Sequence, residues 1–109
     1  MFKIVKNPEF THEVPVVVPV DGGYEPQTLK CRFRVVSADE IARHDFSSPE
    51  GTEAYLRSIV VRFEDVVNEG NIPVPHSDAL TSQLLGVAYI RMAVLRAYTE
   101  AMSKARLGN

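Results

Sequence analysis

The first third of the chain alternates apolar and polar residues with the period of a β-strand. Four valines occupy every second position and therefore share one face: Val14, Val16, Val18 and Val20. Pro15 and Pro19 have the opposite parity, so their missing N–H groups both fall on one edge of the strand. That edge therefore cannot form a regular hydrogen-bond ladder with another strand, while the other edge can. We therefore expect an edge strand here.

A second strand is predicted after the turn residues of the segment Asp21 to Pro26. Apolar and polar residues alternate again between Thr28 and Val36. Those expected to face inward are Leu29, Cys31, Phe33 and Val35, and those expected to face water are Thr28, Lys30, Arg32 and Arg34. A sheet with one wet face is typically antiparallel, so the two strands should form a hairpin. Phe2 to Val5 is a candidate for a further strand.

After this hairpin the apolar spacing changes from two residues to three and four. Ser37-Ala38-Asp39-Glu40 fits a capping box and predicts a short helix over 38–45. Ser48 and Pro49 fit the N-cap and first position of a second helix, which we expect to end at Gly70. Its apolar stripe consists of Tyr55, Leu56, Ile59, Val60, Phe63, Val66 and Val67.

Two more helices are expected behind an extended linker over 71–76, where two prolines forbid a helix. Ser77 and Asp78 cap the first of them, and Gly86 marks a break or kink. The last helix is predicted over 87–105. Its apolar stripe consists of Ile90, Val94, Leu95, Tyr98, Ala101 and Met102. Its basic positions are Arg91, Arg96, Lys104 and Arg106.

The length of 109 residues suits one domain spanning 1–109. Its β-rich part, 1–36, and its helical part, 37–109, are each too short to bury a core alone. We therefore predict an α+β fold in which an N-terminal antiparallel hairpin or small sheet packs on a C-terminal bundle of about four helices. An apolar content of 45% and a charged content of 24% argue against disorder.

The charge and hydropathy patterns narrow the expected location. A net charge of −2 gives no strong field for nucleic acid or for an anionic membrane. No segment approaches the roughly 20 apolar residues of a membrane span. Met1 to Phe10 carries charges and lacks the apolar centre of a signal peptide. We expect a cytoplasmic protein that contacts neither membranes nor nucleic acids.

No spacing of reactive residues matches a known catalytic or metal-binding pattern. His12, His44 and His76 are far apart, and none has a cysteine or histidine at metal-ligand spacing. Cys31 falls on the inward parity, where a thiol behaves as a small hydrophobe. Asp21-Gly22-Gly23 lacks the lysine and the following helix of a phosphate-binding loop. The sequence thus predicts no enzyme, no cofactor and no metal site.

Two features invite comparison with nucleic-acid-binding proteins. Lys30, Arg32 and Arg34 form a basic row, but Phe33 has the opposite parity, so no aromatic residue is interleaved with the row. The helices on either side of Gly86 lack the three- or four-residue turn of a helix-turn-helix motif. A solvated face or a protein-contact face is the better interpretation of the basic row.

A series of individually weak motifs covers most of the chain. In order, the motifs are Val18–Gly23, Phe33-Arg34, Ile59–Val66, Asn68–Asn71, Ile72–Ser77 and Ala97–Ala101. In order and length the chain resembles the tail assembly chaperones of long-tailed phages. That family often has Trp after Gly where this chain has Arg62-Phe63, and an aromatic residue where this chain has His76.

The resemblance implies a non-structural phage or prophage factor in the bacterial cytoplasm. Such a protein binds the tape measure protein, keeps it soluble, recruits tail tube subunits and acts as a homo-oligomer. On this reading Phe63, Ile90, Val94 and Tyr98 are candidate protein-contact residues, although apolar helix stripes usually face the core. Three alternatives stay open: a head–tail or tail terminator subunit, a small DNA-binding regulator, and a small-molecule enzyme with a polar pocket.

Overall fold

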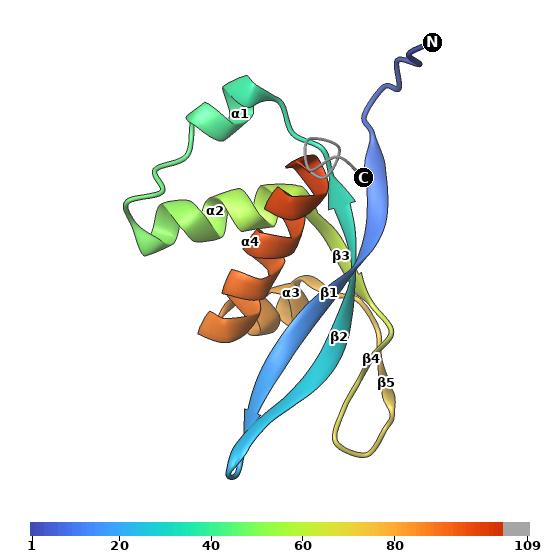
Figure 1. Ribbon diagram of the computed structural model, residues 1–109, viewed down its shortest axis with the longest axis vertical. Coiled ribbons are helices and arrows are strands. Elements are labelled where there is room, and N and C mark those ends of the chain that lie inside the picture. The colour runs from blue at the N-terminus through green and yellow to red at the C-terminus, as the bar shows by residue number, and fades with distance from the viewer. Residues whose placement is uncertain (104–109) are drawn as a thin grey trace.

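The computed structural model describes residues 1–103. Within them the elements are β1 (Glu9–Val20), β2 (Gly23–Arg34), α1 (Ala38–Ala42), α2 (Pro49–Ile59), β3 (Val60–Glu64), β4 (Val66–Val67), β5 (Pro73–Val74), α3 (Asp78–Leu85) and α4 (Ala88–Ser103). Figure 1 shows the helices beside a long β1–β2 hairpin whose tip projects beyond them. The predicted α+β class is confirmed. The expected helix end at Ala105, with Lys104 and Arg106, lies outside the described residues.

Strands β1 and β2 pair antiparallel along their full length, and β3 pairs antiparallel with the other side of β2. The turn of the β1–β2 hairpin consists only of Asp21 and Gly22. Gly22 has φ 77°, a left-handed conformation that glycine adopts without a steric penalty. The predicted turn extended to Pro26 and was too long, because pairing resumes at Gly23.

The prolines of β1 face the free edge of the sheet. The N–H of Val35 donates to the carbonyl oxygen of Pro8 at 3.0 Å, which continues the β1–β2 register beyond Glu9. Hydrogen-bonded and non-bonded pairs alternate in an antiparallel ladder, so odd-numbered β1 residues form the non-bonded pairs. Pro15 and Pro19 are among them and cost the ladder no bond, as the sequence predicts.

The second predicted helix is wrong beyond Ile59, where α2 ends and the chain continues directly as β3. Val60, Val61 and Phe63 are β-branched or aromatic residues that favour a strand, and the side of β2 offers them a ladder. A bulge in this ladder turns both Val60 and Phe63 toward the core, although they are three residues apart. The stripe spacing thus indicated the buried side chains but not the backbone conformation.

Residues expected to end that helix form a short β4–β5 hairpin instead. Asp65 has φ 56° and separates β3 from β4. The side-chain oxygen of Asn68 accepts the N–H groups of Gly70 at 2.8 Å and Ile72 at 3.1 Å. This closes the turn, and it leaves Val67, a predicted member of the helical stripe, exposed on β4.

The predicted helix starts are confirmed. The hydroxyl groups of Ser37, Ser48 and Ser77 each accept a backbone N–H three residues later, at 3.0 to 3.1 Å. The first helix ends at Ala42 and is shorter than expected. Gly86 ends α3 as predicted, with its N–H bonded back to Ser82.

The segment before β1 forms no strand, so the expectation for Phe2 to Val5 was wrong. The side chains of Phe2 and Ile4 are 90% and 89% exposed. Without a neighbour on which to pack, an apolar segment of this length gains nothing from extended pairing. Figure 1 shows it leaving the sheet at the end opposite the hairpin tip.

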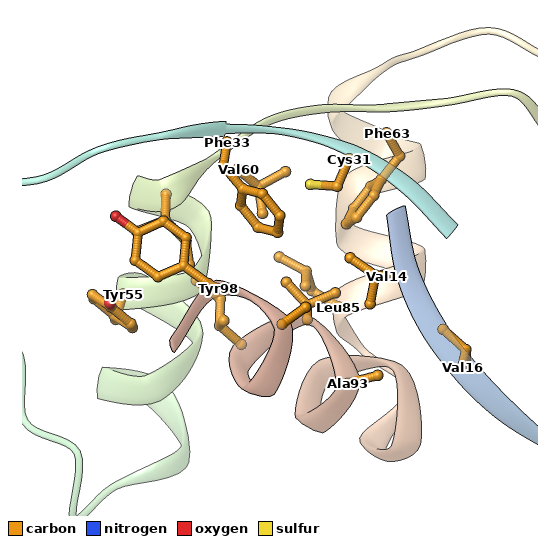
Figure 2. Close-up of a cluster of buried hydrophobic side chains, with 14 residues drawn as sticks. Val14, Val16, Cys31, Phe33, Tyr55, Val60, Phe63, Leu85, Ala93 and Tyr98 are labelled. Atoms are coloured by element: carbon orange, nitrogen blue, oxygen red, sulfur yellow. The ribbon is translucent and has the colours of Figure 1, made fainter. Parts of the chain in front are cut away.

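The core lies between the inner face of the sheet and helices α2 and α4. Figure 2 shows Phe33 of β2, Tyr98 of α4 and Tyr55 of α2 converging from three elements, with ring centroids of Phe33 and Tyr98 5.3 Å apart. The Tyr98 hydroxyl donates to the carbonyl oxygen of Arg34 at 3.0 Å and accepts the N–H of Val36 at 3.3 Å. Tyr98 thereby fixes the end of β2 on α4.

Candidate functional site

Three of the four predicted contact residues belong to the core. Phe63, Val94 and Tyr98 are 2%, 0% and 2% exposed, because β3 completes the sheet and α4 lies across its inner face. They therefore have no surface to offer a partner in this structure. Ile90 lies one turn before Val94 on α4, is half-buried and lines an open groove.

The groove has a volume of about 300 Å³ and lies between the β1–β2 hairpin, β4 and the α3–α4 corner. Its apolar lining includes Val16, Val18, Leu29, Val66, Leu84 and Ile90. The hairpin residues come from the inner face at the point where the helices stop covering it. We call this feature the interhairpin groove, because β1–β2 and β4–β5 form two of its sides.

Exposed apolar side chains accompany the groove on both hairpins and at the start of α4. They are Val20, Val67, Ile72, Tyr89 and Met92, which are 39% to 61% exposed. Single exposed apolar residues are normal on a protein surface. Their concentration beside a groove with an apolar lining is typical of a surface that binds another protein.

The groove lies in the acidic part of the molecule. Segments 14–29 and 65–90 supply all of its lining and contain no lysine or arginine. Their acidic residues are Asp21, Glu25, Asp65, Glu69 and Asp78. Lys30, at the border, contacts Asp65 at 3.4 Å and is the nearest cation along the strand. The surroundings of the groove therefore favour a partner that carries positive charge.

The basic row on the outer face of the sheet is largely neutralised. Its ion pairs are Lys30–Asp65, Arg32–Glu9 and Arg62–Glu64, with N–O distances of 3.4, 3.2 and 2.7 Å. Arg34 donates to the carbonyl oxygen of Ser58 at 2.9 Å. Three of these four cations are paired with acidic groups, so this face keeps little of the unpaired positive charge that phosphate binding uses. The observation favours a solvated face over a nucleic-acid interface.

The geometry of α3 and α4 also differs from a helix-turn-helix motif. Only Gly86 and Val87 separate the two helices. Arg91, near the start of α4, donates to the carbonyl oxygen of Leu85 at 2.8 Å and to Glu53 at 3.3 Å. Since α4 also packs Val94 on the sheet, it is not free to enter a groove of DNA.

Among residues 1–103, no group of three or more His, Cys, Asp or Glu side chains is placed to hold a metal ion. Burial, with a smaller contribution from the Glu64 carboxylate, raises the pKa of the Cys31 thiol to about 12. His12 lies opposite Cys31 in the β1–β2 register, while His44 lies against Tyr55 with ring centroids 5.6 Å apart.

Sequence reasoning missed the β4–β5 side of the groove. It assigned Val66 and Val67 to a helix and 71–76 to a linker, so it gave no hairpin to oppose β1–β2. A signal was present: two valines precede Asn68-Glu69-Gly70-Asn71, and Ile72-Pro73-Val74 follows. Short apolar runs on either side of such a turn segment indicate a hairpin.

Comparisons with protein-family models, with curated proteins and with solved structures give no match. Within residues 1–103, no helix has the length and apolar content needed to cross a membrane.

Proposed function

We propose that this protein is a non-catalytic tail assembly chaperone of a long-tailed phage or prophage, acting in the bacterial cytoplasm. The observation that carries the proposal is the interhairpin groove, an apolar concave surface in acidic surroundings on the part of the inner sheet face that the helices leave uncovered. A site of this kind holds an apolar segment of another protein. It offers no arrangement of acid, base and oxyanion stabiliser.

The position in the structure of the residues that carry the resemblance supports the same proposal. The segment from Asn68 to Ser77 carries two of the motifs shared with tail assembly chaperones. In the structure this segment forms the β4–β5 turn, strand β5 and the N-cap of α3. Strand β5 pairs with β4, whose Val66 and Val67 line the groove, so part of this segment supports one side of the groove.

The client suited to the groove is a helix with an apolar stripe flanked by lysine or arginine. Apolar side chains at i, i+3 and i+4 would face Val16, Leu29 and Ile90, while basic residues would face Glu25 and Glu69. A tape measure protein is long and helical, so it presents such stripes repeatedly. Many copies of a small chaperone on one client gain avidity, which keeps the client soluble. Recruitment of tail tube subunits follows from the resemblance alone.

The proposal is tested by co-expressing the protein with the tape measure protein encoded beside it. We expect the client to become soluble and to elute with the chaperone. The double variant Val67→Ser/Tyr89→Ser removes two exposed groove side chains and should lose the client while keeping its fold. Met102→Ser removes an exposed apolar side chain at the far end of α4 and is the matched control.

Two outcomes would overturn the proposal. The first is a client that stays insoluble with the wild-type chain or is rescued equally by the groove variant. The second is recovery of the protein in stoichiometric amounts from purified particles, which would indicate a structural subunit of the tail terminator type. Duplex DNA binding that weakens steeply with salt would favour the regulator instead.

A further inference from the structure

The segment Met1–Lys6 has the composition of a ligand for the interhairpin groove. Four of its six residues are apolar, and the side chains of Met1, Phe2 and Ile4 are the most exposed large apolar side chains within residues 1–103. The other two residues are Lys3 and Lys6, and no acidic residue precedes Glu9. We call this segment the basic arm.

The basic arm and the groove are complementary in both charge and hydrophobicity. The lining segments of the groove, 14–29 and 65–90, carry acidic residues without lysine or arginine, whereas the arm carries lysines without acidic residues. Both also expose apolar side chains that would lose contact with water when they meet. Burying them is favourable by about 25 cal/mol for each Å² of apolar surface.

The arm cannot place both Phe2 and Ile4 in the groove of its own chain. The Pro8 carbonyl is fixed to Val35 at the end of the sheet opposite the tip. From Pro8, the six residues to Phe2 span at most about 21 Å when fully extended. The four residues from Pro8 to Ile4 span at most about 14 Å. In the other direction along β1, Val14, which lies opposite the groove residue Leu29, is about 20 Å from Pro8, and Val16 is about 26 Å from it. Phe2 could therefore reach only the near end of the groove, and Ile4 could not reach it. Figure 1 shows the N-terminus and the β4–β5 hairpin at opposite ends of the molecule.

We propose that the basic arm of one copy docks into the interhairpin groove of a second copy. Phe2 and Ile4 enter the apolar lining, and Lys3 and Lys6 face the acidic residues of the two hairpins. The contact joins two different surfaces, so it is heterologous and builds either a closed ring or an open chain of copies. It depends on neither the identity nor the existence of a client. A client bound in the groove would displace the arm.

The first experiment measures self-association of the full chain by sedimentation velocity from about 1 μM to about 1 mM. The arm variant Phe2→Ser/Ile4→Ser should associate at least about tenfold more weakly than wild type, since it loses both apolar anchors. These side chains are almost fully exposed, so the variant should unfold at the wild-type temperature. Met102→Ser is again the control and should associate like wild type.

Salt and charge provide an independent measurement. Lys3→Glu/Lys6→Glu should abolish association, and raising the salt concentration should weaken association of the wild-type chain by screening the charges. A wild-type chain that is monomeric at all concentrations, or an arm variant that associates normally, overturns the proposal.

The second experiment mixes two chains whose self-association should each be strongly weakened. The arm variant keeps its groove, and Val67→Arg keeps its arm but places a bulky cation beside the groove. The mixture should form a one-to-one complex and nothing larger, because only one arm and one groove are functional. No complex, or a complex between two arm variants, contradicts docking of the arm into the groove. Failure of either arm experiment leaves client solubilisation by the groove unaffected, so the two proposals fail separately.

Discussion

The two halves of the β1–β2 hairpin follow the same alternation yet have different surroundings. In the half near the chain start, Val14, Cys31 and Phe33 are fully buried under α2 and α4. On the same face in the tip half, Val18 is only half-buried and Val20 is 43% exposed. Alternation therefore determines which side chains share a face, and the reach of the helices determines whether that face is covered. The uncovered remainder forms the groove.

The halves also differ in how their charges are arranged. Near the chain start, Arg32 pairs with Glu9, and Arg62 of the neighbouring strand β3 pairs with Glu64. Toward the tip, the acidic residues Asp21 and Glu25 have no basic residue on their own strands beyond Lys30. The half near the chain start has paired charges and buried apolar side chains. The tip half exposes acidic and apolar side chains to which a partner can bind.

The largest contrast should appear when an aromatic side chain is truncated in each half. Phe33→Ala leaves a cavity in the core and should lower the free energy of unfolding by about 3–5 kcal/mol. Tyr24→Ala should change it by less than about 0.5 kcal/mol, because the side chain lies on the outer face of the tip half and is 73% exposed. Urea unfolding followed by circular dichroism measures both. Equal losses in the two variants would show that the tip half packs as tightly as the core half.

The next effect concerns the hydroxyl that ties α4 to the end of β2. Tyr98→Phe removes a donor to Arg34 and an acceptor for Val36, and it should cost about 1–3 kcal/mol, since the buried groups lose their partner. The matched control is Tyr55→Phe. The Tyr55 hydroxyl has no hydrogen-bond partner among residues 1–103 and is not a buried unsatisfied group. This substitution should cost less than about 0.5 kcal/mol. Similar losses would mean that the Tyr98 hydroxyl does not hold these elements together.

The buried thiol of Cys31 should make the free energy of unfolding depend on pH in the alkaline range. Cys31 loses its proton near 9.0 when its surroundings are ordinary, but burial in the native state raises its pKa to about 12. The unfolded state therefore binds fewer protons between these values, and the free energy of unfolding falls as pH rises through them. The slope is at most about 1.4 kcal/mol per pH unit.

Cys31→Val removes this titration at similar volume and isolates the contribution of the thiol. The wild-type chain should lose more stability than the variant between pH 9.0 and about 12, and the same below that range. Burial also raises the pKa values of Tyr55 and Tyr98, so the variant keeps part of the dependence. A difference between the chains that is flat with pH would contradict a buried thiol.

The features of the fold that could be predicted from sequence are those determined by interactions between residues close together in the chain. Ser37, Ser48 and Ser77 begin helices because each supplies a hydrogen bond within three residues. The strand at Val60 was missed because spacings of three suit a helix as well as a bulged strand. Only the open side of β2, formed far away in the sequence, decides between them.

In the candidate site, too, the outcome depended on contacts between segments far apart in the sequence. The spacing of Phe63, Val94 and Tyr98 fits residues that contact a partner as well as residues of the core. No neighbouring residue in the sequence distinguishes the two. Ile90 was predicted with them, yet it alone of the four lines the groove, because α4 begins beyond the covered part of the sheet. Which apolar residues remain exposed depends on how far each helix extends over the hairpin, which is a property of the assembled fold.

The smallest effect tests the charge contrast between the halves. Arg62 lies opposite Arg32 in the β2–β3 register, so Glu64→Gln leaves two like charges facing each other with one fewer acidic neighbour. It should destabilise the protein by a few tenths to about 1 kcal/mol. Glu25→Gln removes one acidic group from an acidic region and should be neutral or slightly stabilising. Both differences should shrink at 1 M salt, where screening acts within about 3 Å. If both variants lose stability equally, the charges of the tip half are as well paired as those of the core half, and the acidic groove would have no surplus charge to attract a basic partner.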